Sequence, residues 1–160
     1  MSDWKFLFGG SFALNVLGLL VLVGAWFWRA QLYRQWIHPT VTARQVSFFK
    51  QFPVGTGDVV FLGDSLTSQG RWGELFPGVP VRNRGISGDV TADVLARLEE
   101  ITTASPSQIF LMIGTNDLGL GLSEEVLLGN VSAILEEIRR ASPETELYLQ
   151  TLLPLSLIHI

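Results

Sequence analysis

The sequence predicts an α/β protein: a three-layer, doubly wound parallel sheet preceded by one apolar N-terminal helix. From residue 58 onward, short apolar runs alternate with stretches of helical spacing, as in strands joined by right-handed helical crossovers. The runs are continuous, which favours parallel strands covered on both faces. A separate uncharged run lies near the N-terminus. We therefore expect a membrane anchor over 1–35, a juxtamembrane helical linker over 36–57 and a sheet domain over 58–160.

The first element is an uncharged run of 23 residues, from position 6 to position 28. As a helix it would be about 34 Å long, enough for a hydrocarbon core of about 30 Å. Tryptophans stand near both ends and Lys5 and Arg29 bound the run, as in a membrane helix with interfacial aromatic residues. A cleaved signal peptide has a shorter apolar core, and a buried core helix is rarely apolar all round. The pattern favours a single-pass membrane protein whose helix contacts lipid.

Four strands and two helical stretches follow in the sheet domain. The apolar runs 59–62, 79–81, 109–113 and 147–153 are expected to be strands. Helical spacing separates the second run from the third and the third from the fourth, at Val94, Leu95, Leu98 and Ile101 and at Leu127, Val131, Ile134 and Ile138. Ser123 can cap the second helix, which has acidic residues in its first turn and basic residues in its last.

The composition excludes several classes of function. The chain of 160 residues is 48% hydrophobic, which excludes disorder for most of it. It has no cysteine, which excludes disulfide scaffolds, cysteine-based zinc sites and a cysteine nucleophile. The formal net charge of −4 argues against a nucleic-acid partner. Two histidines are too few for most histidine-built metal sites, so no metal is expected.

Polar clusters follow the first three expected strands. They are Gly-Asp-Ser-Leu at 63–66, Asn-Arg-Gly-Ile-Ser-Gly-Asp at 83–89 and Gly-Thr-Asn-Asp at 114–117. Because ligands bind at the carboxyl ends of parallel strands, we expect all three clusters on one rim of the sheet.

Ser65 is the candidate nucleophile of this rim. It follows a strand within a tight turn, where a hydroxyl can project into the crevice. Attack on an acyl carbon places negative charge on the carbonyl oxygen, which fixed hydrogen-bond donors stabilise. Candidate donors are the backbone N–H of Ser65, the backbone at Gly88, where the lack of a side chain permits close approach, and the amide of Asn116.

The three clusters resemble blocks I, II and III of the SGNH (GDSL) hydrolase superfamily of serine esterases and lipases. The resemblance covers roughly 58–154, and the 72–76 (WGELF) and 83–89 segments look most like the platelet-activating-factor acetylhydrolase-like branch. It implies a flavodoxin-like fold of the SGNH type, Ser65 as nucleophile, Gly88 and Asn116 as the oxyanion hole, a small acylated or acetylated substrate, and no metal or organic cofactor.

The remaining polar residues of the clusters are given structural roles. Asp64, Asp89 and Asp117 are each interpreted as a cap or a loop-fixing hydrogen-bond acceptor. Arg84 is interpreted as a solvated rim residue, and contact with an anionic substrate group is the alternative.

The chain departs from the family in its last block, an Asp-x-x-His that supplies the catalytic base. Three residues before His159 stands Ser156, and His38 precedes the nucleophile, where an interfacial or solvated histidine is expected. The catalytic His and Asp are therefore not present. We expect a C-terminally incomplete fragment, truncated after the fourth strand and inactive as it stands. Residues 155–160 are apolar where a substrate-side loop is expected, which raises the hypothesis that they are not the native continuation.

Two functional hypotheses stay open. The first is a membrane-anchored serine hydrolase acting on an ester. The second is a non-catalytic, membrane-anchored SGNH-like protein whose rim binds an acylated or glycan ligand. A flavodoxin or receiver domain has similar patterning, but a receiver needs an acidic cluster and a phosphoacceptor aspartate where Ser65 stands.

Overall fold

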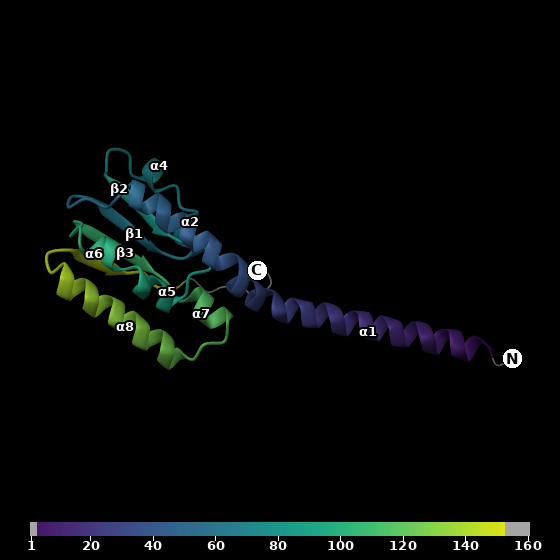
Figure 1. Cartoon of the computed structure of the whole chain (residues 1–160). Coiled ribbons are helices and arrows are strands. Elements are labelled where there is room, and N and C mark those ends of the chain that lie inside the picture. The colour runs from purple at the N-terminus through teal and green to yellow at the C-terminus, as the bar shows by residue number, and fades with distance from the viewer. Residues whose placement is uncertain (1–2, 153–160) are drawn as a thin grey trace. The chain divides into compact units, whose positions relative to one another are not determined.

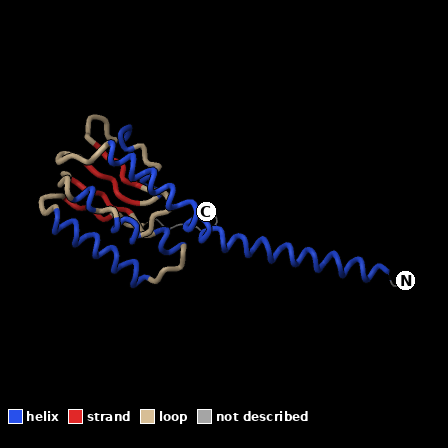
Figure 2. Tube along the Cα trace, viewed as in Figure 1, coloured by secondary structure: helices blue, strands red, loops and turns tan. Residues whose placement is uncertain are grey.

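The computed structural model describes the backbone of residues 3–152 and the side chains of 14–25, 28, 29 and 31–152. The chain divides into two compact units, Met1–Pro39 and Thr40–Ile160. Figure 1 labels elements of both units where there is room, and Figure 2 separates helices from strands by colour.

The first unit is helical throughout its described part. Helix α1 (Asp3–Leu32) continues into a π-helical turn, η1 (Tyr33–Ile37), and α2 (His38–Gln51) begins at the next residue. Within the described residues, no helix is both long enough and apolar enough to cross a membrane. The structure therefore does not support the predicted span over 6–28; the side chains of 6–13, 26 and 27 lie outside its description. His38, for which an interfacial or solvated position was expected, is 5% exposed, with its ring 6.2 Å from that of Tyr33.

The second unit contains the predicted parallel sheet. Its strands are β1 (Val59–Gly63), β2 (Val81–Gly85), β3 (Gln108–Met112) and β4 (Glu146–Leu149), in the order β2-β1-β3-β4. Every neighbouring pair is parallel, and Gly63 is in register with both Gly85 and Met112. The prediction of a parallel α/β sheet is confirmed.

Strand β2 lies further along the chain than predicted. The apolar run placed it at 79–81 with a rim loop from Asn83, whereas the structure has it at Val81–Gly85. Its polar residues are accommodated because Arg82 pairs with Asp58 at 2.6 Å and Arg84 pairs with Glu100 at 2.9 Å. An ion-paired arginine can occupy a strand position that patterning assigns to a loop.

The main hydrophobic core lies between one face of the sheet and three helices. These are α5 (Thr91–Ala96), α6 (Glu99–Thr102) and α8 (Glu124–Ala141), so the helix expected around 94–101 is two short ones. The core includes Val60, Leu62, Val94, Leu98, Ile101, Ile109, Leu111, Ile134 and Ile138. Alternate strand positions face the other side. There the rings of Phe61, Phe110 and Tyr148 stack across three strands, and Trp72 stacks on Phe61.

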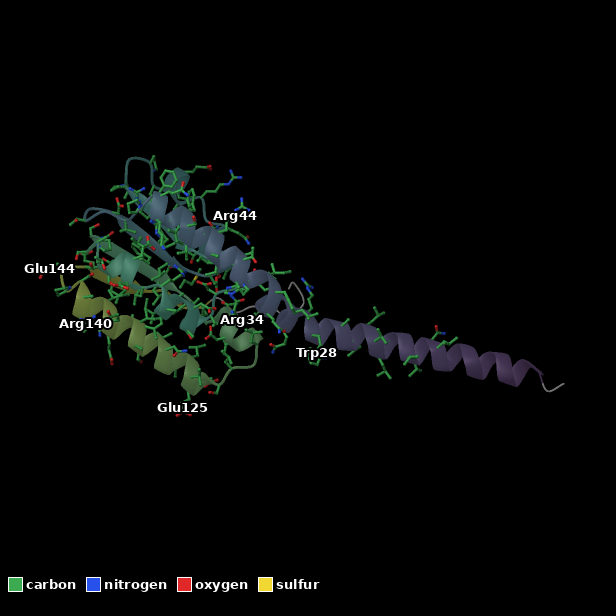
Figure 3. All side chains as sticks on the ribbon, viewed as in Figure 1. Trp28, Arg34, Arg44, Glu125, Arg140 and Glu144 are labelled. Atoms are coloured by element: carbon green, nitrogen blue, oxygen red, sulfur yellow. The ribbon has the colours of Figure 1, made fainter. Side chains whose placement is uncertain are left out.

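Helix α8 has complementary charges at its two ends. Ser123 is its N-cap and accepts a hydrogen bond from the N–H of Val126 at 3.3 Å, as predicted. Glu125 in the first turn and Arg140 in the last are labelled near opposite ends of α8 in Figure 3. The acidic residue lies at the positive end of the helix macrodipole and the basic residue at its negative end, so both charges stabilise the helix.

Candidate active site

The carboxyl ends of β1, β2 and β3 lie side by side at one rim. Strands β2 and β3 flank β1 in parallel, so the segments that follow them emerge at the same edge. The first cluster starts at the last residue of β1, the second starts within β2 and continues past its end, and the third starts just after β3. The topology therefore gathers residues that are about 50 positions apart in the chain.

The turn that carries Ser65 is fixed by Asp64. The Asp64 carboxylate accepts a hydrogen bond from the N–H of Leu66 at 2.9 Å and so caps the short helix α3 (Ser65–Ser68). The Asp64 carbonyl also accepts from the N–H of Ser68 at 2.9 Å. Ser65 is half-buried, and its hydroxyl has no hydrogen-bond partner among the described residues. A hydroxyl in this setting is available to a substrate or a base.

Two glycines permit the close packing of this turn. A Cβ at Gly85 would lie 2.7 Å from the Cα of Ser68 and 2.8 Å from the carbonyl oxygen of Asp64. A Cβ at Gly63 would overlap the carbonyl of Met112. Because these atoms belong to backbone, only glycine allows strand β2 to approach the turn this closely.

Asn83 and Trp72 hold the far end of the turn. The side-chain amide of Asn83 donates to the carbonyls of Thr67, Ser68 and Gly70, at 3.0, 3.1 and 3.3 Å. The indole N–H of Trp72, in α4 (Trp72–Leu75), donates to the Thr67 carbonyl at 2.9 Å. The sequence indicated both residues as parts of motifs but not as donors to this turn.

The second cluster ends in a loop, residues 86–89, which follows β2. Gly88 has φ of +88°, a left-handed conformation that favours glycine. The next residue, Asp89, is fully buried and pairs with the Nε of Arg97 at 2.9 Å. This ion pair therefore fixes the loop at the residue next to Gly88, the candidate oxyanion glycine.

The third cluster lies on α7 (Thr115–Gly119), and Asn116 joins it to the second. The Asn116 side-chain amide donates to the carbonyl of Asp89 at 2.8 Å. Asp117 is fully buried and accepts from the N–H of Thr91 at 3.1 Å and from its hydroxyl at 2.6 Å. Asn130 of α8 donates to the same hydroxyl at 2.9 Å.

Each of the three clusters contributes one buried carboxyl group, from Asp64, Asp89 and Asp117. Burial raises the pKa of the Asp64 carboxyl, the hydrogen bond from Leu66 opposes this, and the charges of Asp89 and Asp117 raise it further.

The expectation that Arg84 is solvated is wrong. Instead of being solvated it is 2% exposed, and it donates to the Phe52 carbonyl at 2.6 Å besides pairing with Glu100. Its guanidinium carbon lies 4.4 Å from the centre of the Phe49 ring. Burial lowers the pKa of Arg84, and Glu100 opposes that shift.

Arg97 was missed by the sequence analysis although its spacing gave a signal. It lies on the same helical stripe as Val94, Leu98 and Ile101, so its position predicts burial. A charged residue on a buried stripe indicates a buried partner. The catalytic histidine is not supplied by residues 40–152, which contain none, and His159 lies outside the described residues.

Comparison with known proteins agrees with the rim motifs. The profile of the GDSL-like Lipase/Acylhydrolase family matches residues 61–158. The platelet-activating factor acetylhydrolase IB subunit alpha1 of Homo sapiens is 35% identical over 103 residues, which are 61% of this chain and 44% of the relative. The chain thus spans less than half the length of the curated relatives it matches.

Solved structures give the same match in three dimensions. A Streptococcus pneumonia protein named for platelet activating factor superposes with a TM-score of 0.69 at 29% identity, over 81% of this chain and 62% of the other. A mutant of the esterase AlinE4 superposes with a TM-score of 0.52 at 26% identity, over 60% of this chain and 59% of the other.

Proposed function

Because the chain belongs to the GDSL-like lipase/acylhydrolase family, within the SGNH hydrolase superfamily, we propose that it is a serine hydrolase that cleaves an ester bond. Ser65 is the nucleophile, and the backbone N–H of Gly88 and the side-chain amide of Asn116 bind the oxyanion. The substrate is a small acyl or acetyl ester. The names of the matched acetylhydrolase relatives support that substrate class.

The observation that carries the proposal is the hydrogen bond from Asn116 to the carbonyl of Asp89 at 2.8 Å. A side-chain amide has two N–H donors. One fixes Asn116 beside the loop that contains Gly88, and the second is left for a ligand. Donors held in place before the reaction are what stabilises a developing oxyanion.

The reaction proceeds in two steps. The Ser65 oxygen attacks the ester carbonyl carbon while its proton passes to a base, and the alcohol leaves with a proton as the acyl-enzyme forms. Water then attacks the acyl-enzyme, which releases the acid and restores Ser65. By resemblance to the family, the base is the histidine of an Asp-x-x-His block, which residues 3–152 do not contain.

We also propose, from the sequence alone, that the uncharged run over 6–28 anchors the protein in a membrane and gives it a lipid partner.

The nucleophile is tested in the protein as its gene encodes it. We expect hydrolysis of short p-nitrophenyl esters and labelling of Ser65 by a fluorophosphonate, both abolished by Ser65→Ala. Ser132→Ala, which removes an exposed hydroxyl from α8, is the matched control and should change neither. Labelling at another serine would remove Ser65 from its role. Binding of an acylated ligand without Ser65-dependent turnover would favour the non-catalytic alternative.

A further inference from the structure

Arg97 makes contacts that no motif assigns. It is the C-cap of α5, and its side chain is 9% exposed. Its Nε donates to the carboxylate of Asp89 at 2.9 Å. Its Nη2 donates to the carbonyl of Gly63 at 3.2 Å and to the carbonyl of Arg84 at 2.9 Å. One guanidinium therefore has three acceptors on two strands and a loop.

Those acceptors lie next to the proposed reacting groups. Gly63 ends β1 two residues before Ser65, and Asp89 directly follows Gly88. The Gly63 carbonyl also accepts from the N–H of Ile86 at 3.0 Å, so it is shared between Arg97 and the start of the oxyanion loop. Arg97 thus connects the segment that carries the nucleophile to the segment that carries the oxyanion glycine.

We infer that Arg97 is a positioning residue, which fixes the separation between Ser65 and the oxyanion donor at Gly88. The guanidinium suits this role because its donors form a rigid planar fork. Small displacements of a nucleophile or an oxyanion donor are costly in rate. The inference rests on the proposed ester hydrolysis, but the positioning itself can be measured without turnover.

The Nη1 of Arg97 is buried and has no hydrogen-bond partner in the part of the chain that the structure describes. Replacing Arg97 therefore removes only the Nε and Nη2 contacts, which all go to the site segments. Arg84 is the control because it is also an arginine with a largely buried side chain and a carboxylate partner. Its side chain contacts Glu100 of α6, the Phe49 ring of α2, the Phe52 carbonyl just after α2, and the carbonyl of the neighbouring Asn83, but not the segments 63–66 and 86–89.

The first measurement compares kinetics of Arg97→Met, Arg97→Lys and Arg84→Met in the protein as encoded. With a short p-nitrophenyl ester we expect Arg97→Met to lower kcat by about 100-fold, the scale of a 1 Å misplacement, with little change in KM. Arg97→Lys should recover part of the loss, because an ammonium can still pair with Asp89 but does not form the fork. Arg84→Met should lower the Tm and leave kcat unchanged.

The second measurement is hydrogen exchange, which requires no catalysis. In Arg97→Met, amides within 63–66 and 86–89 should exchange faster than in the parent, and in Arg84→Met they should not. If the parent has no Ser65-dependent activity, the proposed function fails, and exchange alone decides the positioning. If Arg97→Met does not fold, Arg97→Lys is judged by the same measurements. Parent-like exchange in the Arg97 variants, or an equal loss of kcat in Arg84→Met, would overturn the inference.

Discussion

Asn116 combines two tasks in one side chain, which makes it the most informative residue to change after Ser65. One amide N–H is bonded to the Asp89 carbonyl, and the other is proposed to meet the oxyanion. We expect Asn116→Ala to lower kcat by about 10²–10³-fold, the usual effect of losing one oxyanion donor. Gln108→Ala removes an amide at the opposite end of β3 and is the control. Steady-state kinetics would contradict the assignment if Asn116→Ala retained the parent kcat.

Asp64 gives a pH-dependent prediction. Burial raises its pKa above the value of about 3.9 in an unfolded chain. The folded state then binds the proton more tightly, so the contribution of this group to stability is present below the unfolded pKa and is lost as the pH rises through the folded pKa. Asp64→Asn keeps a cap on α3 without the charge. We expect it to raise the Tm near pH 7 and to raise it less near pH 4.

A control variant separates the effect of the capping hydrogen bond of Asp64 from the effect of its charge. Asp64→Ala loses the hydrogen bond from the N–H of Leu66, which should cost about 1 kcal/mol relative to Asp64→Asn at both pH values. Thermal unfolding of the three proteins at each pH measures both effects. A larger gain for Asp64→Asn near pH 4 than near pH 7 would show that the sign is wrong.

The local motifs and the turns that carry them could be predicted from the sequence. The partners that their residues find far along the chain could not. The turn containing Ser65 was recognised because its signal is contained in four adjacent residues. Arg84 was misjudged because its partner, Glu100, is 16 positions away and nothing local shows that the two will meet. The roles of Ser65, Gly88 and Asn116 stay predictions until the variants are assayed.

At the scale of elements, the contact between β2 and the nucleophile turn depends on Gly85. A Cβ there would be forced against the backbone of Ser68 and Asp64. We expect Gly85→Ala to destabilise the protein by about 1–3 kcal/mol, as overpacking does, and to abolish ester hydrolysis by displacing Ser65. Gly73→Ala in α4, where an added Cβ meets nothing within 4 Å, is the control and should leave both unchanged. A fully active Gly85→Ala protein would show that the turn does not need this close approach.

The elements themselves were predictable where apolar patterning was strong. Strands β1 and β3 are found where continuous runs predicted them, because burial on both faces requires such runs. The position predicted for strand β2 was wrong because its sequence, Val-Arg-Asn-Arg-Gly, is polar. Its arginines form ion pairs only with residues outside the strand. Helical spacing around 94–101 located the buried stripe but did not reveal that Arg97 ends α5.

For the whole molecule, parallel topology is what turns three separate motifs into one rim. Because β2, β1 and β3 are adjacent and point the same way, their carboxyl ends meet whatever the lengths of the connections. The fold class could therefore be predicted from the order of runs alone, and the rim followed from it. Further hydrogen bonds hold the rim segments in place, and they come from Asn83, Arg97 and Thr91. These bonds join segments that are distant in the chain, so they could not be predicted from the sequence.

The proposed membrane anchor is a property of the whole chain and is tested by fractionation. We expect the protein to pellet with membranes, to resist extraction by carbonate at high pH, and to become extractable when residues 1–35 are deleted, because the uncharged run over 6–28 is long enough to cross a bilayer. Leu17→Lys places a charge near the middle of that run, at a cost to insertion of about 2.5–3.5 kcal/mol, and should shift the protein toward the soluble fraction. Leu17→Ile is the matched control and should behave as the parent. An intact parent protein that remains in the soluble fraction, or a Leu17→Lys variant that pellets as the parent does, would refute the anchor.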